Sequence, residues 1–65
     1  MKLQIFILGQ ESPVIVSGKE AKKVLDIIAI SSIRKTDYMF KVVDEATNYI
    51  THIRPQYITM IREDD

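Results

Sequence analysis

No cysteine occurs anywhere in this chain of 65 residues. A domain of this length buries only about 60% of the surface that its unfolded chain exposes, so its stability is marginal. Small domains compensate with disulfides, a structural metal or a partner subunit. Disulfides and thiolate zinc sites are excluded, and the single histidine, His52, cannot form a metal site without several carboxylates around it. We therefore expect no metal and no cofactor, and we expect the chain to form a homo-oligomer.

The composition is that of a folded chain. Hydrophobic residues make up 46% and charged residues 28%, with only two glycines and two prolines, which predicts one ordered domain over residues 1–65. No apolar run approaches the roughly 18–20 residues that span a bilayer. The short apolar start, residues 1–9, is interrupted by Gln4 and is followed by no cleavage site of the secretory type. These features predict a cytoplasmic protein with no membrane partner.

The first third of the chain reads as a hairpin followed by a helix. Residues 2–8 alternate as a strand does, residues 9–12 have turn composition, and Pro13 opens a second strand over 14–16. Ser17 and Glu20 have the spacing of a capping box, with Ser17 at the N-cap. Apolar residues then recur at helical spacing, which predicts a helix over 18–30 that frays at 31–32.

Beyond Lys35 the period of the apolar residues changes to two. Strands are expected over 38–43, 49–53 and 56–61, with a turn at 44–48 and a break at Arg54 and Pro55, because proline cannot donate to a central ladder. The acidic tail, residues 63–65, is expected to fray. The predicted order is ββαβββ, an α+β fold with one helix packed on a small curled antiparallel sheet.

Twenty residues are β-branched, and only one helix is available to cover the sheet. Several predicted strands nevertheless carry apolar groups on both faces: Phe6 and Leu8, Met39 and Val43, Tyr57 and Ile61. Exposed apolar surface of this kind usually marks an interface, which again predicts self-association. A sheet that curls and closes on itself is the alternative explanation.

The residues required for catalysis are scarce. His52 is the only histidine, and its strand neighbour Thr51 points to the opposite face. The adjacent acids Asp44 and Glu45 fall in a turn, where carboxylates are ordinarily solvated. Gly18 and Lys19 lack the earlier glycine and the following hydroxyl residue of a phosphate loop. We therefore predict no catalytic residues and a protein that is not an enzyme.

Three lysines, Lys19, Lys22 and Lys23, fall in the first turns of the predicted helix. Cations at this end oppose the helix dipole, so their presence needs a reason. They form either a solvated face with Glu20 and Asp26 as partial partners, or an anion or nucleotide site together with free backbone N–H groups.

A second group mixes cations with tyrosines, and its members are Arg34, Tyr49, His52, Arg54 and Tyr57, with Lys35, Tyr38 and Arg62 nearby. Arginine and tyrosine are enriched at protein interfaces. Aromatic and basic groups on a sheet also bind single-stranded nucleic acid, although the net charge of zero argues against it. The tyrosines could equally be structural. The group is therefore a candidate surface for a partner or a ligand.

The order of these parts resembles small phage and prophage accessory proteins of low-GC Gram-positive bacteria. The resemblance is carried by the N-terminal hairpin and by residues 16–25 and 49–61. It implies a non-enzymatic protein that binds a host factor or its own kind in the host cytoplasm, and it transfers no site residues. The leading hypothesis is thus an oligomeric binding protein that inhibits or regulates a host protein. The alternative is a nucleotide- or nucleic-acid-binding module that uses the lysines and the Arg/His/Tyr group.

Overall fold

The computed structural model describes residues 1–34 and 39–64, and in them one α-helix and five strands follow the order ββαβββ. The strands are β1 (Lys2–Ile7), β2 (Val14–Ser17), β3 (Phe40–Val43), β4 (Ile50–Ile53) and β5 (Ile58–Asp64). The helix α1 spans Gly18–Arg34, and a short 3₁₀ helix, η1 (Pro55–Tyr57), precedes β5. The predicted α+β class and the predicted order of elements are confirmed.

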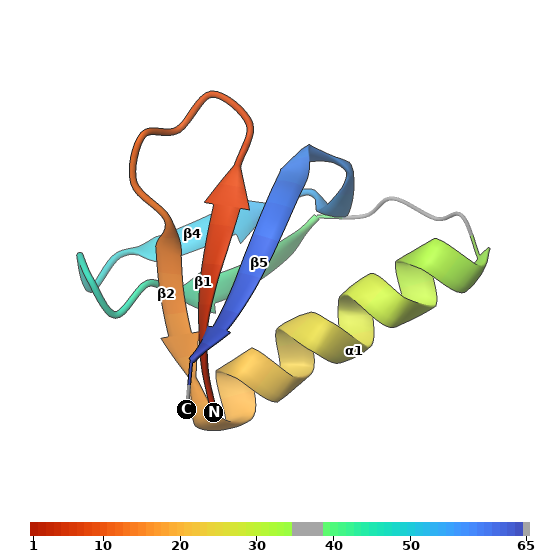
Figure 1. The fold of residues 1–65 in the computed structure, drawn as a ribbon, viewed down its shortest axis with the longest axis horizontal. Coiled ribbons are helices and arrows are strands. Elements are labelled where there is room, and N and C mark those ends of the chain that lie inside the picture. The colour runs from red at the N-terminus through yellow and green to blue at the C-terminus, as the bar shows by residue number, and fades with distance from the viewer. Residues whose placement is uncertain (35–38, 65) are drawn as a thin grey trace.

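Strand β1 lies at the centre of a three-stranded antiparallel sheet, between β2 and β5 (Figure 1). Leu3 pairs with Val16 and Ile5 pairs with Val14, so the apolar side chains of both strands share one face. All four are buried, whereas Gln4 alternates onto the opposite face. The predicted N-terminal hairpin is therefore confirmed, and β5 completes the sheet by pairing along the length of β1.

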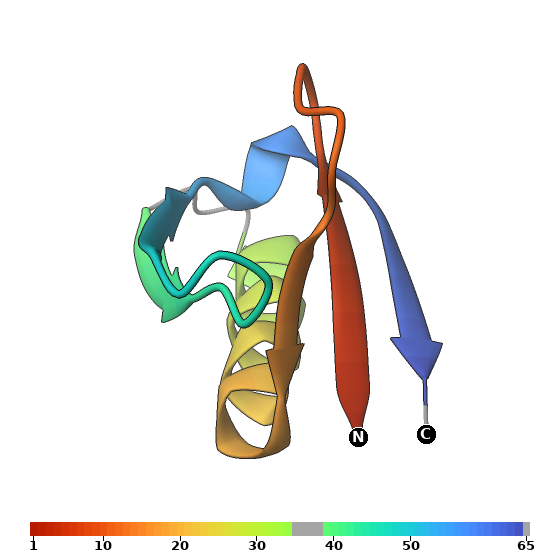
Figure 2. The same ribbon diagram turned by 90° about the vertical axis from the view of Figure 1, so that its left-hand side faces the viewer.

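Helix α1 packs on the buried face of this sheet. Ala21 and Val24 are fully buried, and Leu25 and Ile28 pack against the same core. Figure 2 shows α1 and the hairpin of β3 and β4 on the same side of the three-stranded sheet. The outer face of that sheet, which is turned toward the viewer in Figure 1, has no described element over it.

The β3–β4 hairpin packs its inner side chains on the core, since Phe40, Val42 and Ile53 are all buried. Its turn is fastened to the free edge of β2, where the backbone of Ile15 donates to the Asp44 carboxylate at 3.1 Å. The Glu45 N–H donates to the Ile15 carbonyl at 2.8 Å. Because a side-chain oxygen replaces a backbone carbonyl here, the ladder is interrupted. The strands are divided between two sheets and do not form the single curled sheet that the sequence predicts.

The start of α1 uses Ser17 in a contact that the sequence does not predict. Ser17 is the last residue of β2, and its hydroxyl donates a hydrogen bond to the carboxylate of Glu45. The chain turns at Gly18, whose φ of +58° is a left-handed conformation that costs residues with a Cβ about 1–2 kcal/mol. The N–H of Gly18 donates to the Met1 carbonyl at 3.0 Å. Helix α1 thus begins at Gly18, as predicted, but the Ser17 hydroxyl bonds to a carboxylate of the distant turn, and the capping box stays a prediction.

Several element ends lie further along the chain than predicted. Helix α1 continues beyond residue 30 to Arg34, and the buried residues on its inner side continue as far as Ser31. The predicted strand 56–61 begins as η1, and β5 then runs to Asp64. The tail predicted to fray is therefore paired, with Asp64 opposite Lys2. Residues 35–38, which include Lys35 and Tyr38, and Asp65 lie outside the described residues.

Apolar side chains reach the surface on several elements. Phe6 is half-buried on the outer sheet face, with the guanidinium carbon of Arg62 at 5.6 Å from the centre of its ring. The large apolar side chains that are exposed are Met1, Leu8, Ile30, Ile33, Met39, Val43, Tyr49, Ile50, Tyr57 and Met60. Two groups stand out in this set, one on the β3–β4 hairpin and one on the last turns of α1.

Candidate functional site

The side chains of β3 and β4 that point away from the core form a small continuous surface, which we call the hairpin face: Lys41, Val43, Ile50 and His52. Val43 lies opposite Ile50 and Lys41 lies opposite His52 in the antiparallel register. Val43 is 43% exposed and Ile50 is 63% exposed, although both are apolar β-branched residues. The hairpin face thus places an uncovered apolar pair beside a polar pair that includes the charged Lys41.

The turn that joins β3 to β4 holds this face in position. Asp44 accepts hydrogen bonds at its backbone carbonyl from Thr47 and Asn48, at 3.3 and 2.7 Å, and its own N–H donates to the carbonyl of Tyr49 at 2.9 Å. Asn48 takes a φ of 67°, a left-handed conformation that asparagine tolerates better than most residues. The turn closes tightly as a result, and it leaves Tyr49 73% exposed at the start of β4.

Asp44 is the residue that fixes the hairpin to the rest of the fold. Its carboxylate oxygen Oδ1 accepts from the backbone N–H of Ile15 at 3.1 Å and from that of Ala46 at 3.0 Å, and the residue is only 7% exposed. The sequence predicts that the Asp44 carboxylate, in the turn between β3 and β4, is solvated. This prediction is wrong, because β2 covers the carboxylate. The neighbouring acid, Glu45, accepts from Ser17. Both acids therefore have structural hydrogen bonds.

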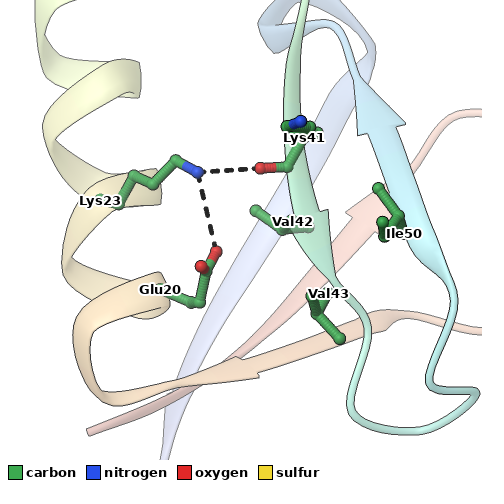
Figure 3. Close-up of a pocket in the computed structure, with 6 residues that line it drawn as sticks. All are labelled: Glu20, Lys23, Lys41, Val42, Val43 and Ile50. Atoms are coloured by element: carbon green, nitrogen blue, oxygen red, sulfur yellow. Dashed lines mark hydrogen bonds and ion pairs between the residues drawn. The ribbon is translucent and has the colours of Figure 1, made fainter.

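A hollow of about 120 Å³, open to solvent, adjoins the hairpin face (Figure 3). It is lined by Glu20, Lys23, Lys41, Val42, Val43 and Ile50. Lys41, Val43 and Ile50 belong to both the hollow and the hairpin face, so the two are continuous. The valines and the isoleucine make this hollow apolar, and its charged groups come from the helix and from Lys41. A hollow of this composition suits a side chain of a protein partner better than a charged small molecule.

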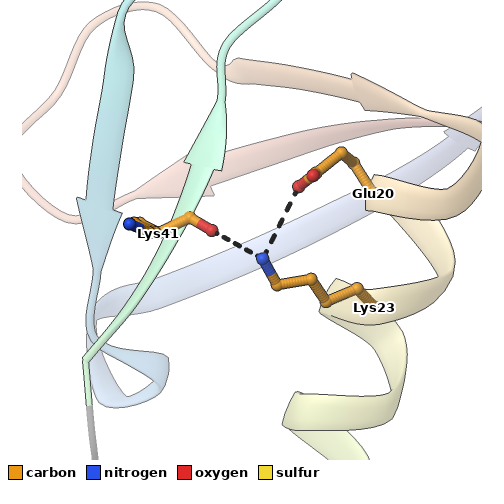
Figure 4. Close-up of polar contacts among 3 residues, drawn as sticks. All are labelled: Glu20, Lys23 and Lys41. Carbon is orange, nitrogen blue, oxygen red and sulfur yellow. Dashed lines mark hydrogen bonds and ion pairs between the residues drawn. The ribbon is translucent and has the colours of Figure 1, made fainter.

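The three lysines at the start of α1 have different surroundings. The Lys23 ammonium donates to the carbonyl of Lys41 at 3.0 Å and lies 3.9 Å from Oε2 of Glu20 (Figure 4). Lys23 therefore ties the helix to β3 and brings a carboxylate close to the proposed anion site. Lys19 and Lys22 are exposed. The anion site stays a prediction, and it rests on these two lysines.

The residues predicted as a partner surface are only partly brought together. Tyr49 and His52 lie on the hairpin, and Arg54 follows directly after β4, where it is exposed. Tyr57 ends η1 on another part of the surface, with its carbonyl accepting from the Leu8 N–H at 2.8 Å. Arg34 ends α1, which projects away from β4 in Figure 1. Sequence reasoning named Val43 only among the apolar groups on both faces of the strands, and it missed Lys41 and Ile50, because alternation alone does not show which side of the hairpin is buried.

Comparisons with known proteins give no relative of this chain. No protein-family model matches it, and searches of curated proteins and of solved structures find no match. Within residues 1–34 and 39–64, no helix is long and apolar enough to cross a membrane. No three histidine, aspartate or glutamate side chains in that part of the chain lie close enough together to hold a metal ion.

Proposed function

We propose that this protein is a non-enzymatic binding module that recognises another protein through the hairpin face, and that it inhibits or regulates that partner by covering part of its surface. The observation that carries this proposal is the exposed pair of Val43 and Ile50, held in position by the hydrogen bonds of Asp44 in the turn. Apolar side chains in a contiguous exposed patch usually mark an interaction site. Tyr49 lies beside them, and tyrosine is enriched among the interface residues that contribute most to the free energy of binding.

The charges around the apolar pair indicate the chemistry of the partner. Lys41 and His52 lie side by side on the hairpin face, and Arg54 follows them along the chain. No acidic side chain belongs to the hairpin face. A partner with an apolar patch bordered by carboxylates would therefore match both the shape and the charge, and charge complementarity favours its correct orientation.

A protein partner accounts for the surface better than a nucleic acid does. The net charge is zero, and Lys23 already donates to Lys41 and lies beside Glu20. Binding of single strands usually relies on several aromatic side chains in a basic groove, whereas Tyr49 is the only exposed aromatic residue within residues 40–53, which form the hairpin. A host protein as the partner of a phage-encoded chain stays a prediction from the resemblance.

The proposal predicts that Ile50→Asp abolishes partner binding and leaves the fold intact. Ile50 is exposed, so the substitution buries no charge in the free protein, but it places a carboxylate at the centre of the apolar contact. The tagged protein is used to capture partners from a bacterial lysate after nuclease treatment. We expect the recovery of the protein partner to fall by about tenfold or more, the size of effect that a loss of about 1.4 kcal/mol or more produces.

Met60→Asp is the matched control. Met60 is 43% exposed on β5, in the three-stranded sheet, and receives the same new charge. It should leave capture unchanged, and circular dichroism should show folded protein for both variants. Capture that survives Ile50→Asp but is lost with Met60→Asp contradicts the assignment of the hairpin face, and would place the contact on the outer sheet face.

A further inference from the structure

The solvent side of α1 changes character halfway along the helix. In the first half it carries the charged residues Lys19, Lys22 and Asp26, all exposed. In the second half Ile30 is 43% exposed and Ile33 is 81% exposed. The opposite side of the same turns is also apolar, since Ile27 and Ile28 pack against the core. Large apolar side chains on the solvent side of a helix are normally covered by a partner.

Two charges border the apolar part of this surface symmetrically. Asp26 lies four residues before Ile30, and Arg34 lies four residues after it. At about 100° per residue, these positions drift by only about 40° at each step, so all three lie on one side of the helix. Both charged residues are exposed, and neither forms an ion pair with any residue in the described ranges.

We propose that a second copy of this chain covers the apolar end of α1, with the two helices antiparallel and a two-fold axis passing close to Ile30. This arrangement places Asp26 opposite the partner's Arg34, and Arg34 opposite the partner's Asp26, because both lie at the same distance from the axis. Ile33 is then covered by the other helix beside the central pair of isoleucines. A parallel arrangement in register brings Asp26 against Asp26 and Arg34 against Arg34, and like charges disfavour it.

The contact is short. The segment between Asp26 and Arg34 rises by only about 12 Å at 1.5 Å per residue, so the buried area is smaller than in a standard stable interface. Lys19 and Lys22 lie outside the overlap. The dimer is therefore reversible and depends on concentration. It is independent of the hairpin face, which lies on other elements and is left free for a different protein.

Sedimentation velocity over micromolar to millimolar concentrations tests this proposal with exchanged charges. The wild-type chain should shift from monomer to dimer as its concentration rises. Asp26→Arg alone and Arg34→Asp alone should each weaken dimerisation by about tenfold or more, because each creates two repulsive pairs. The double variant, with both substitutions, should recover most of the wild-type affinity, since the opposite charges face each other again.

Rescue by the double variant would show that the single variants weaken a contact between two copies. If a single variant instead damaged the fold of one copy, exchanging the charges would not repair it. Ile33→Ser, at an exposed position, should also weaken the dimer while the circular dichroism stays unchanged. A wild-type chain that remains monomeric at all these concentrations overturns the proposal. So does a dimer that none of these substitutions affects, which would place the contact elsewhere, such as the outer edge of β5.

Discussion

Ile53→Ala is expected to lower the free energy of unfolding by about 2–5 kcal/mol, the range for truncating a large buried aliphatic side chain. Ile53 is 2% exposed and lies opposite Phe40 on the inner side of the hairpin, where it joins the core. A chain of 65 residues has a total stability of about 3–10 kcal/mol at usual values per residue. We therefore expect a large fraction of this variant to be unfolded at 37 °C.

Ile50→Ala provides the matched control, because it is the same substitution in the same strand. Ile50 is 63% exposed, so its truncation should change stability by no more than about 0.5 kcal/mol. Urea denaturation measures both variants, and an unchanged slope shows that only the midpoint has moved. Equal losses in the two variants would contradict the assignment of inner and outer sides to β4.

Asp44→Ala is expected to lower the free energy of unfolding by about 2–4 kcal/mol, because it removes a charged acceptor and leaves a partly buried donor unpaired. The Oδ1 atom accepts from the backbone N–H groups of Ile15 and Ala46. Asp44→Asn keeps an oxygen at this position and loses only the charge, so it should cost about 1 kcal/mol.

Hydrogen exchange tests this role at the level of single amides. In Asp44→Ala the amide of Ile15 should exchange faster, because the hairpin turn no longer protects the edge of β2. The amide of Val24, in the middle of α1, reports on global unfolding and serves as the reference. If Asp44→Ala and Asp44→Asn have the same stability as the wild-type chain, the turn is held to β2 by other contacts and this account of the hairpin is wrong.

Much of the fold follows from local patterns in the sequence. Apolar residues alternate in β1 and β2, and they recur at helical spacing from Ala21 onward. These patterns are enough to predict the order of elements, because each pattern identifies one face of one element. The start of α1 at Gly18 follows as well, since the helix was predicted from residue 18. The partner of the Ser17 hydroxyl does not follow, because Glu45 lies 28 residues further along the chain.

The site was harder to predict for the same reason. Ile50 and Ile53 are identical residues in one strand, and alternation shows only that they point to opposite faces. The docking of the hairpin decides which of the two isoleucines points into the core. This docking depends on Asp44, and an aspartate in a turn is ordinarily solvated. The sequence therefore indicated Tyr49 and His52 as surface residues but could not show that Val43 and Ile50 accompany them.

The dependence of partner binding on salt tests the proposed function most directly. The affinity of the purified chain for the captured partner is measured at low and at high ionic strength, for the wild type and for Lys19→Gln combined with Lys22→Gln. An apolar contact with a few bordering charges predicts an affinity that falls modestly with salt and is unchanged by the lysine substitutions. Binding that weakens steeply with salt, requires both lysines and is competed by a single-stranded oligonucleotide would contradict it and support the nucleic-acid alternative.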